Sequence, residues 1–166
     1  MALISNRRLA AMVGVLVLTA LAVSGCATTP QAAVTPTATD VWIKAVPKID
    51  AMDMTGMFGV FSNSSDEVIY IVGGQASDAG LTGTKLDAHE VIKDANGKMV
   101  MQEVKTGIPI PAHGSVTLKP GSYHIMLWNL EKPIVAGDKV SVTLQFSNGT
   151  SLEVAADARD IANYAG

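Results

Sequence analysis

The stretch VSVTLQFSNGTSLEVA, residues 140–155, decides the fold of this 166-residue chain. Apolar and polar residues alternate from Val140 to Phe146, which is the two-residue period of a strand with one buried face. Ser147 to Thr150 then supplies turn residues, and Ser151 to Ala155 continues as a second strand. The pattern predicts a β-hairpin.

Short apolar segments separated by turn residues recur along the chain from Val41 onward. Gly, Pro, Asn and Asp separate these segments, and no internal repeat is visible. The expected strands cover residues 41–46, 54–62, 68–72, 86–93, 98–104, 116–118, 123–130, 140–146 and 151–155. About seven to nine short strands of this kind predict an all-β domain, either a sandwich or a barrel.

Residues 1–25 have the features of a lipoprotein signal peptide. Two arginines precede an apolar run from Leu9 to Ala22, which is shorter than the ~20 residues of a membrane span. Small residues then precede Cys26, as in the lipidation signal of bacterial lipoproteins, and Cys26 is the only cysteine of the chain. We therefore expect Cys26 to be lipidated. The protein would be anchored to the cell membrane outside the cytoplasm, on the extracellular face or in the periplasm.

Composition divides the rest of the chain into three parts. Residues 26–40 are rich in Ala, Thr and Pro and predict a tether, residues 41–156 carry the strand pattern, and residues 157–166 are expected to form a C-terminal tail. The formal net charge is −3. A mildly acidic domain is a poor partner for nucleic acid, which favours a basic face, so we expect no nucleic-acid partner.

The candidate site residues are histidines and methionines. Side chains two apart in a strand share a face, so His124 faces the same way as Met126, and Met99 the same way as Met101. Thioether sulfur is a soft ligand that selects Cu(I), and imidazole is compatible with it. A single methionine is more typical of core packing. The clustering of these methionines with His89 and His124 is what indicates copper.

Other residues give weaker signals. Met52, Met54 and Met57 form a second group, for which core packing is expected ahead of auxiliary copper contacts. His113 is expected to be an exposed loop residue. The sequence contains no serine nucleophile elbow, no activated cysteine and no HExxH motif, so we expect no enzymatic activity.

These residues and their neighbours resemble the PCuAC family of bacterial periplasmic copper chaperones. The most specific element is LKPGSYHIM, residues 118–126, and it follows His89-Glu90, Met99-Val100-Met101 and Ile110-Pro111-Ala112. The resemblance runs from about Val41 to Phe146. It implies a cupredoxin-like Greek-key β-sandwich.

The resemblance also implies a function, which is to bind Cu(I) outside the cytoplasm. Its implied ligands are His89, Met101, His124 and Met126, with Met99 as an auxiliary candidate. The implied partners are copper ion and a copper-receiving protein, such as a cytochrome oxidase subunit or another copper chaperone. Two alternatives stay open. One is an immunoglobulin-like envelope lipoprotein that binds proteins without metal. The other is an electron-transfer cupredoxin, which the lack of a cysteine ligand disfavours.

The turn around Gly97 decides whether His89 and Met101 share a face. A two-residue loop pairs Met101 with Ile92 and places His89 on the other face. A three-residue loop with Gly97 in a left-handed conformation pairs Met101 with Val91, and His89 then shares its face. The predicted copper site requires the second register.

Overall fold

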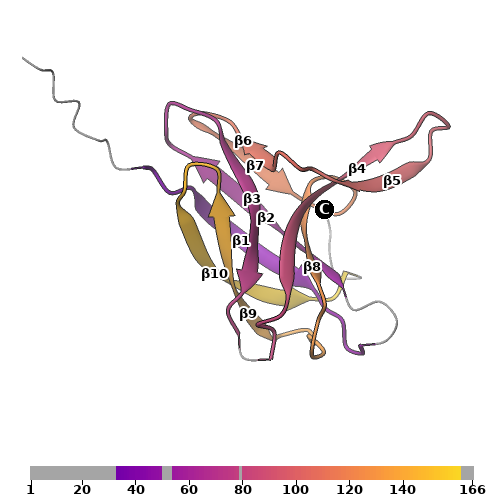
Figure 1. The fold of residues 1–166 in the computed structure, drawn as a ribbon. Helices are drawn as coiled ribbons and strands as arrows, with labels where there is room; N and C mark the ends of the chain where they lie inside the picture. The colour runs from indigo at the N-terminus through magenta and orange to yellow at the C-terminus, as the bar shows by residue number, and fades with distance from the viewer. Residues whose placement is uncertain (1–32, 50–53, 79, 162–166) are drawn as a thin grey trace, which may run out of the picture. The chain divides into compact units, whose positions relative to one another are not determined.

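The computed structural model describes residues 33–49, 54–78 and 80–161, all within one compact unit that spans residues 32–166. Within these ranges the chain forms ten β-strands (Figure 1), and no helix there is long and apolar enough to cross a membrane. The strands are β1 (Thr37–Lys44), β2 (Thr55–Asn63), β3 (Ile69–Ala76), β4 (Lys85–Lys93), β5 (Met99–Glu103), β6 (Ile108–Ile110), β7 (Gly114–Leu118), β8 (His124–Trp128), β9 (Lys139–Phe146) and β10 (Ser151–Arg159). The expected all-β domain is confirmed.

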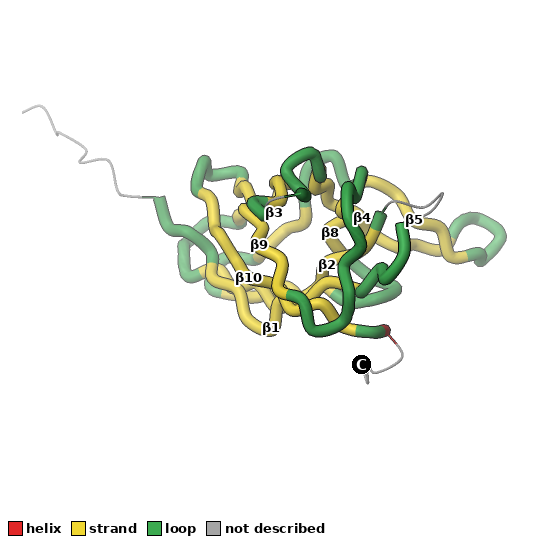
Figure 2. The backbone as a smooth tube through the Cα atoms, turned by 90° about the horizontal axis from the view of Figure 1, so that it is seen from below, coloured by secondary structure: helices red, strands yellow, loops and turns green. Residues whose placement is uncertain are grey.

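The strands belong to one continuous sheet in the order β5-β4-β8-β2-β1-β10-β9-β3-β6, with β7 paired to β2. Because β3 also pairs with β4, the seven strands from β4 to β3 close on themselves. Figure 2 shows these strands arranged around a common interior. β9 and β10 form the expected antiparallel hairpin, and β10 pairs with β1 in parallel. The expected two-layer Greek-key sandwich is therefore not confirmed, and the sheet is barrel-like.

A glycine pair in β3 explains this closure and corrects one prediction. The sequence analysis ends this strand at Val72, before Gly73 and Gly74, but β3 continues to Ala76. A Cβ on Gly74 would overlap the carbonyl oxygen of Thr143 in β9, so the close approach of the two backbones requires glycine. The two glycines let β3 pair with β9 and β4 at the same point instead of ending the strand.

Strand β6 was not predicted, because Pro109 lies at its centre and proline removes a backbone donor. The structure places β6 at the end of the sheet, where it pairs with β3. An edge strand tolerates proline, since one of its sides has no ladder to complete.

The boundaries of the folded part are wider than predicted. β1 begins at Thr37, inside the predicted tether 26–40, and β10 ends at Arg159, inside the predicted tail 157–166. Thr37 pairs with β2, and β10 pairs with β1 as far as Arg159, so pairing with a neighbour extends both strands beyond their apolar segments. The predicted signal peptide and Cys26 lie outside the described residues.

The hydrophobic core lies inside the closed sheet. The apolar residues of β9 are buried there, as their alternation predicts. Leu86 and Ala88 of β4 and Ile125 and Leu127 of β8 point into the same core. Residues between them in each strand therefore point to the outer face of the sheet, where the histidines and methionines of these strands lie.

Candidate metal centre

The β4–β5 hairpin, which projects from the barrel in Figure 1, carries two of the predicted ligands. Val91 pairs with Met101, and Gly97 in the turn has a φ of 78°. The observed register is therefore the bulged one that the predicted site requires. His89, two residues before Val91, shares a face with Met101.

β8 lies beside β4 and brings the other two predicted ligands to the same face. His124 lies directly opposite His89, and Met126 lies opposite Asp87. The imidazole ring centroids of His89 and His124 are 6.0 Å apart. The four predicted ligands therefore share one outward face of three neighbouring strands.

His124 is held in one tautomer by the backbone. Its Nδ1 lies 2.9 Å from the carbonyl oxygen of Ser122, and because a carbonyl only accepts, Nδ1 carries the hydrogen. The neutral ring then has its lone pair on Nε2, which lies 3.2 Å from Sδ of Met101. Two tetrahedral ligands with metal–nitrogen and metal–sulfur bonds of roughly 2.0 and 2.3 Å lie about 3.5 Å apart. Nε2 and Sδ are therefore spaced much as two ligands of one ion would be.

His89 contributes a ring nitrogen that has no hydrogen-bond partner. Its side chain is 8% exposed, and its Nδ1 is buried without a hydrogen-bond partner. Burial lowers the pKa of His89 below its usual 6.5, and the neighbouring His124 lowers it further, whereas Asp87 and Glu103 oppose the shift. The ring is therefore neutral at neutral pH, which is the form that binds metals.

A pocket of about 300 Å³ opens beside these residues. Met101, His124 and Met126 line it, together with Met54 and Phe58. Its lining contains no carboxylate among the described residues. Hard cations such as Ca²⁺ and Mg²⁺ need oxygen ligands, so sulfur and imidazole suit a softer cation. In the described ranges, no group of three or more His, Cys, Asp or Glu side chains is placed to hold a metal ion.

The structure separates the remaining methionines. Met99 lies opposite Lys93 on the projecting hairpin and is 51% exposed, and it does not line the pocket. Met57 is buried in the core, as expected for its group, whereas Met54 lines the pocket. Met52 lies outside the described residues.

The sequence analysis favoured core packing for Met54 over an auxiliary copper contact, and it did not identify the carbonyl of Ser122. Met54 and Met57 are three positions apart, so an extended chain points them to opposite faces. This spacing could have shown that the two methionines do not both pack in the core. The sequence gives no such signal for the carbonyl of Ser122, because every residue has a backbone carbonyl. Its contact with His124 depends on how the chain enters β8.

The fold and the site together define a barrel-like β-domain with imidazole and thioether groups gathered on one outer face. By sequence, the chain belongs to the family described as "Putative lipoprotein LpqE-like", whose profile matches residues 37–158. It is also 37% identical over 158 residues to "Putative lipoprotein Lxx21020" of Leifsonia xyli subsp. xyli (strain CTCB07). That match covers 88% of this chain and 90% of the relative.

Solved structures with a similar fold are PCuAC domains. The "Copper-bound PCuAC domain from PmoF2" matches with a TM-score of 0.57 and 18% identity, covering 75% of this chain and 92% of that one. The "Apo PCuAC domain from PmoF1" matches with a TM-score of 0.53 and 16% identity, covering 75% and 93%. The likeness establishes the fold, and the predicted resemblance to the PCuAC family is confirmed at that level.

Proposed function

We propose that this protein binds Cu(I) outside the cytoplasm and carries it while anchored to the cell membrane by a lipid on Cys26. One observation supports the copper assignment most strongly. Nε2 of His124 and Sδ of Met101 lie 3.2 Å apart, and the neighbouring ring of His89, 6.0 Å from that of His124 between centroids, has a buried and unpaired Nδ1. A polar atom left unpaired in a buried position costs about 1–3 kcal/mol, which a bound ion would recover.

The donor set favours Cu(I) among the common metal ions. His89, Met101, His124 and Met126 supply two imidazoles and two thioethers, and thioether sulfur selects Cu(I). A methionine loses no proton when it binds. Binding therefore depends on pH only through the two histidines. One structural neighbour is a copper-bound PCuAC domain, which supports the same assignment.

The exposure of the site supports a carrier in preference to an enzyme. Met101 is 45% exposed on the projecting hairpin, whereas Met126 is 6% exposed at the base of the site. An ion held between an exposed and a buried ligand is accessible to a partner from one side. We propose that this partner is a copper-receiving protein, such as a cytochrome oxidase subunit or another copper chaperone.

The test of copper binding is an anaerobic Cu(I) titration of residues 32–166, the compact unit that contains all ten described strands. A competing Cu(I) chelator reports affinity, and X-ray absorption reports the ligands. We expect one Cu(I) per domain with both nitrogen and sulfur ligands. A domain that leaves all Cu(I) on the chelator would contradict the proposal and favour the immunoglobulin-like protein-binding module.

The anchor has a separate test in a bacterial host that processes lipoproteins. Cys26→Ser removes the thiol that would carry the lipid, so we expect the variant to leave the membrane fraction. A variant that stays in the membrane fraction would show that another segment holds the protein there.

A further inference from the structure

We propose that Met54 is a third thioether of this pocket, and that Cu(I) is bound to it as the ion enters and leaves the site. This inference rests on the proposed function. It adds a residue that lies outside the four predicted ligands and far from them in sequence.

Strand pairing places Met54 on the face of the predicted ligands. β2 pairs with β8, with Gly56 opposite Met126 and Thr55 opposite Leu127. Met54 lies two residues before Gly56, so it shares the face of Gly56 and Met126. The pocket lining confirms this placement, since it includes Met54 together with Met101 and Met126.

A hydrogen bond from a buried side chain holds the start of β2 in position. Thr55 is buried, and its hydroxyl donates to the carbonyl oxygen of Lys44 at the end of β1, at 2.7 Å. Met54 is attached directly to this anchored residue. Sites built on rigid elements are held more accurately than sites on loops.

Gly56 leaves room for the ring of Phe58 to line the pocket near Met54. This glycine lines the pocket opposite Met126, and a Cβ there would lie 2.8 Å from Cζ of Phe58. Gly56 itself therefore adds no side chain to this face. The β2 side of the pocket is lined by the thioether of Met54 and the aromatic ring of Phe58, together with Thr55 and Gly56.

The pocket lining suggests an order in which the ligands act. Met54, Met101, His124 and Met126 line the pocket, whereas the largely buried His89 does not. An ion that arrives through the pocket therefore meets three thioethers and one imidazole first. The bond from copper to Nδ1 or Nε2 of His89 then forms as the bond to Sδ of Met54 breaks. Copper stays Cu(I) throughout, and no proton is transferred because neutral His89 supplies the electron pair. Release follows the reverse order.

The test compares Met54→Leu with Met99→Leu in the domain of residues 32–166. Met99 is the matched control, because it is an exposed methionine near the site that does not line the pocket. Anaerobic stopped-flow measurement with a coloured Cu(I) chelator gives the rates of loading and release, and equilibrium competition gives the affinity. Leucine conserves volume and apolarity, so both variants should keep their thermal stability.

We expect Met54→Leu to slow both loading and release about tenfold, with a much smaller change in affinity, because Met54 is bound only during transfer. Met99→Leu should behave as the wild type. Unchanged rates in a copper-binding Met54→Leu would overturn this inference alone, as would equal slowing by Met99→Leu. A wild-type domain that takes up no Cu(I) would overturn the proposed function and this inference with it.

Discussion

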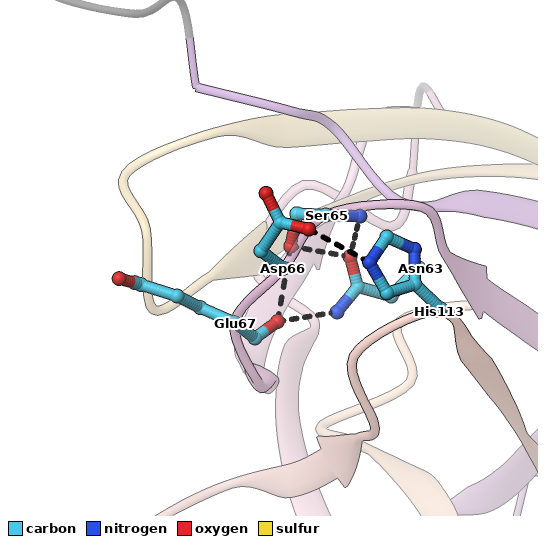
Figure 3. A network of polar contacts seen from close by, with 5 residues as sticks. All are labelled: Asn63, Ser65, Asp66, Glu67 and His113. Carbon is cyan, nitrogen blue, oxygen red and sulfur yellow. Dashed lines mark hydrogen bonds and ion pairs between the residues drawn. The ribbon is translucent and has the colours of Figure 1, made fainter.

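Two histidine-containing clusters of the barrel differ in how completely their polar atoms are paired. The polar clasp consists of Asn63, Ser65, Asp66, Glu67 and His113 and joins the turn after β2 to the turn before β7 (Figure 3). Asn63 donates to the carbonyl oxygen of Glu67 at 2.7 Å and accepts from the backbone N–H of Ser65 at 2.9 Å. Nε2 of His113 lies 2.8 Å from a carboxylate oxygen of Asp66.

In the candidate metal centre, by contrast, ring nitrogens that could bind a metal lack a carboxylate or backbone partner. Nδ1 of His89 is buried and unpaired, and Nε2 of His124 faces a sulfur atom. Leaving a buried polar atom unpaired costs stability, so natural proteins tolerate it mainly where a ligand completes the pairing. The comparison teaches that hydrogen-bond pairing separates His113 from His89, which residue type alone cannot do.

The largest expected effect is a loss of Cu(I) affinity when a histidine of the metal centre is replaced, compared with a histidine of the polar clasp. His124→Ala removes a lone pair that faces Met101, so we expect Cu(I) binding to weaken about a hundredfold or more. His113→Ala, the matched control, should leave the affinity unchanged, because its ring is paired with Asp66. Chelator competition on both variants measures the difference. Equal losses in the two variants would remove the distinction between the clusters.

A substitution in the polar clasp should lower the stability of the domain, whereas a substitution in the metal centre should lower its Cu(I) affinity. Asn63→Ala removes the hydrogen bonds of this side chain to the carbonyl oxygens of Ile110 and Glu67 and to the backbone N–H of Ser65, so it should destabilise the domain by about 1–3 kcal/mol. Urea unfolding measures this change. Cu(I) affinity of the folded variant should equal that of the wild type, and a tenfold loss would show that the clasp acts on the site.

Methionines inside and outside the pocket should differ in their effect on Cu(I) affinity. Met126→Leu keeps size and apolarity, so it should cost less than ~1.5 kcal/mol of stability. It should still weaken Cu(I) binding at least about tenfold, which is ~1.4 kcal/mol. Met99→Leu should cost less affinity, since Met99 lies outside the pocket. Thermal melts of the apo forms provide the folding control. A large loss for Met99→Leu beside an unchanged Met126→Leu would show that the family motif was assigned to the wrong methionines.

The smallest effect concerns the pH dependence of the apo protein. The folded-state pKa of His89 lies below its unfolded value of about 6.5, so between these two values the unfolded state binds more protons. The free energy of unfolding should therefore fall as the pH falls below about 6.5. His89→Gln should show a shallower fall than the wild type between about pH 7.5 and 5.5 in urea unfolding. Parallel curves would show that His89 does not titrate differently on folding.

Local patterns in the sequence predicted much of this molecule. Alternation in β9 predicted the buried face of that strand, and the predicted copper site required the β4–β5 register that the structure shows, in which His89 and Met101 share a face. The shared face of His124 and Met126 also follows from a spacing of two in one strand. These predictions succeeded because strand period and hairpin register depend on residues close together in the chain.

By itself, then, the sequence determined the all-β class, most of the strands and the parity of the site residues within each strand. Only the tertiary structure decided that His89 lies opposite His124, that Met54 reaches their pocket, and that β3 closes the sheet on β4. Each of these depends on pairing between strands distant in the chain. Such pairing is selected by packing of the whole core and by close backbone approach at residues such as Gly74, which no local period encodes.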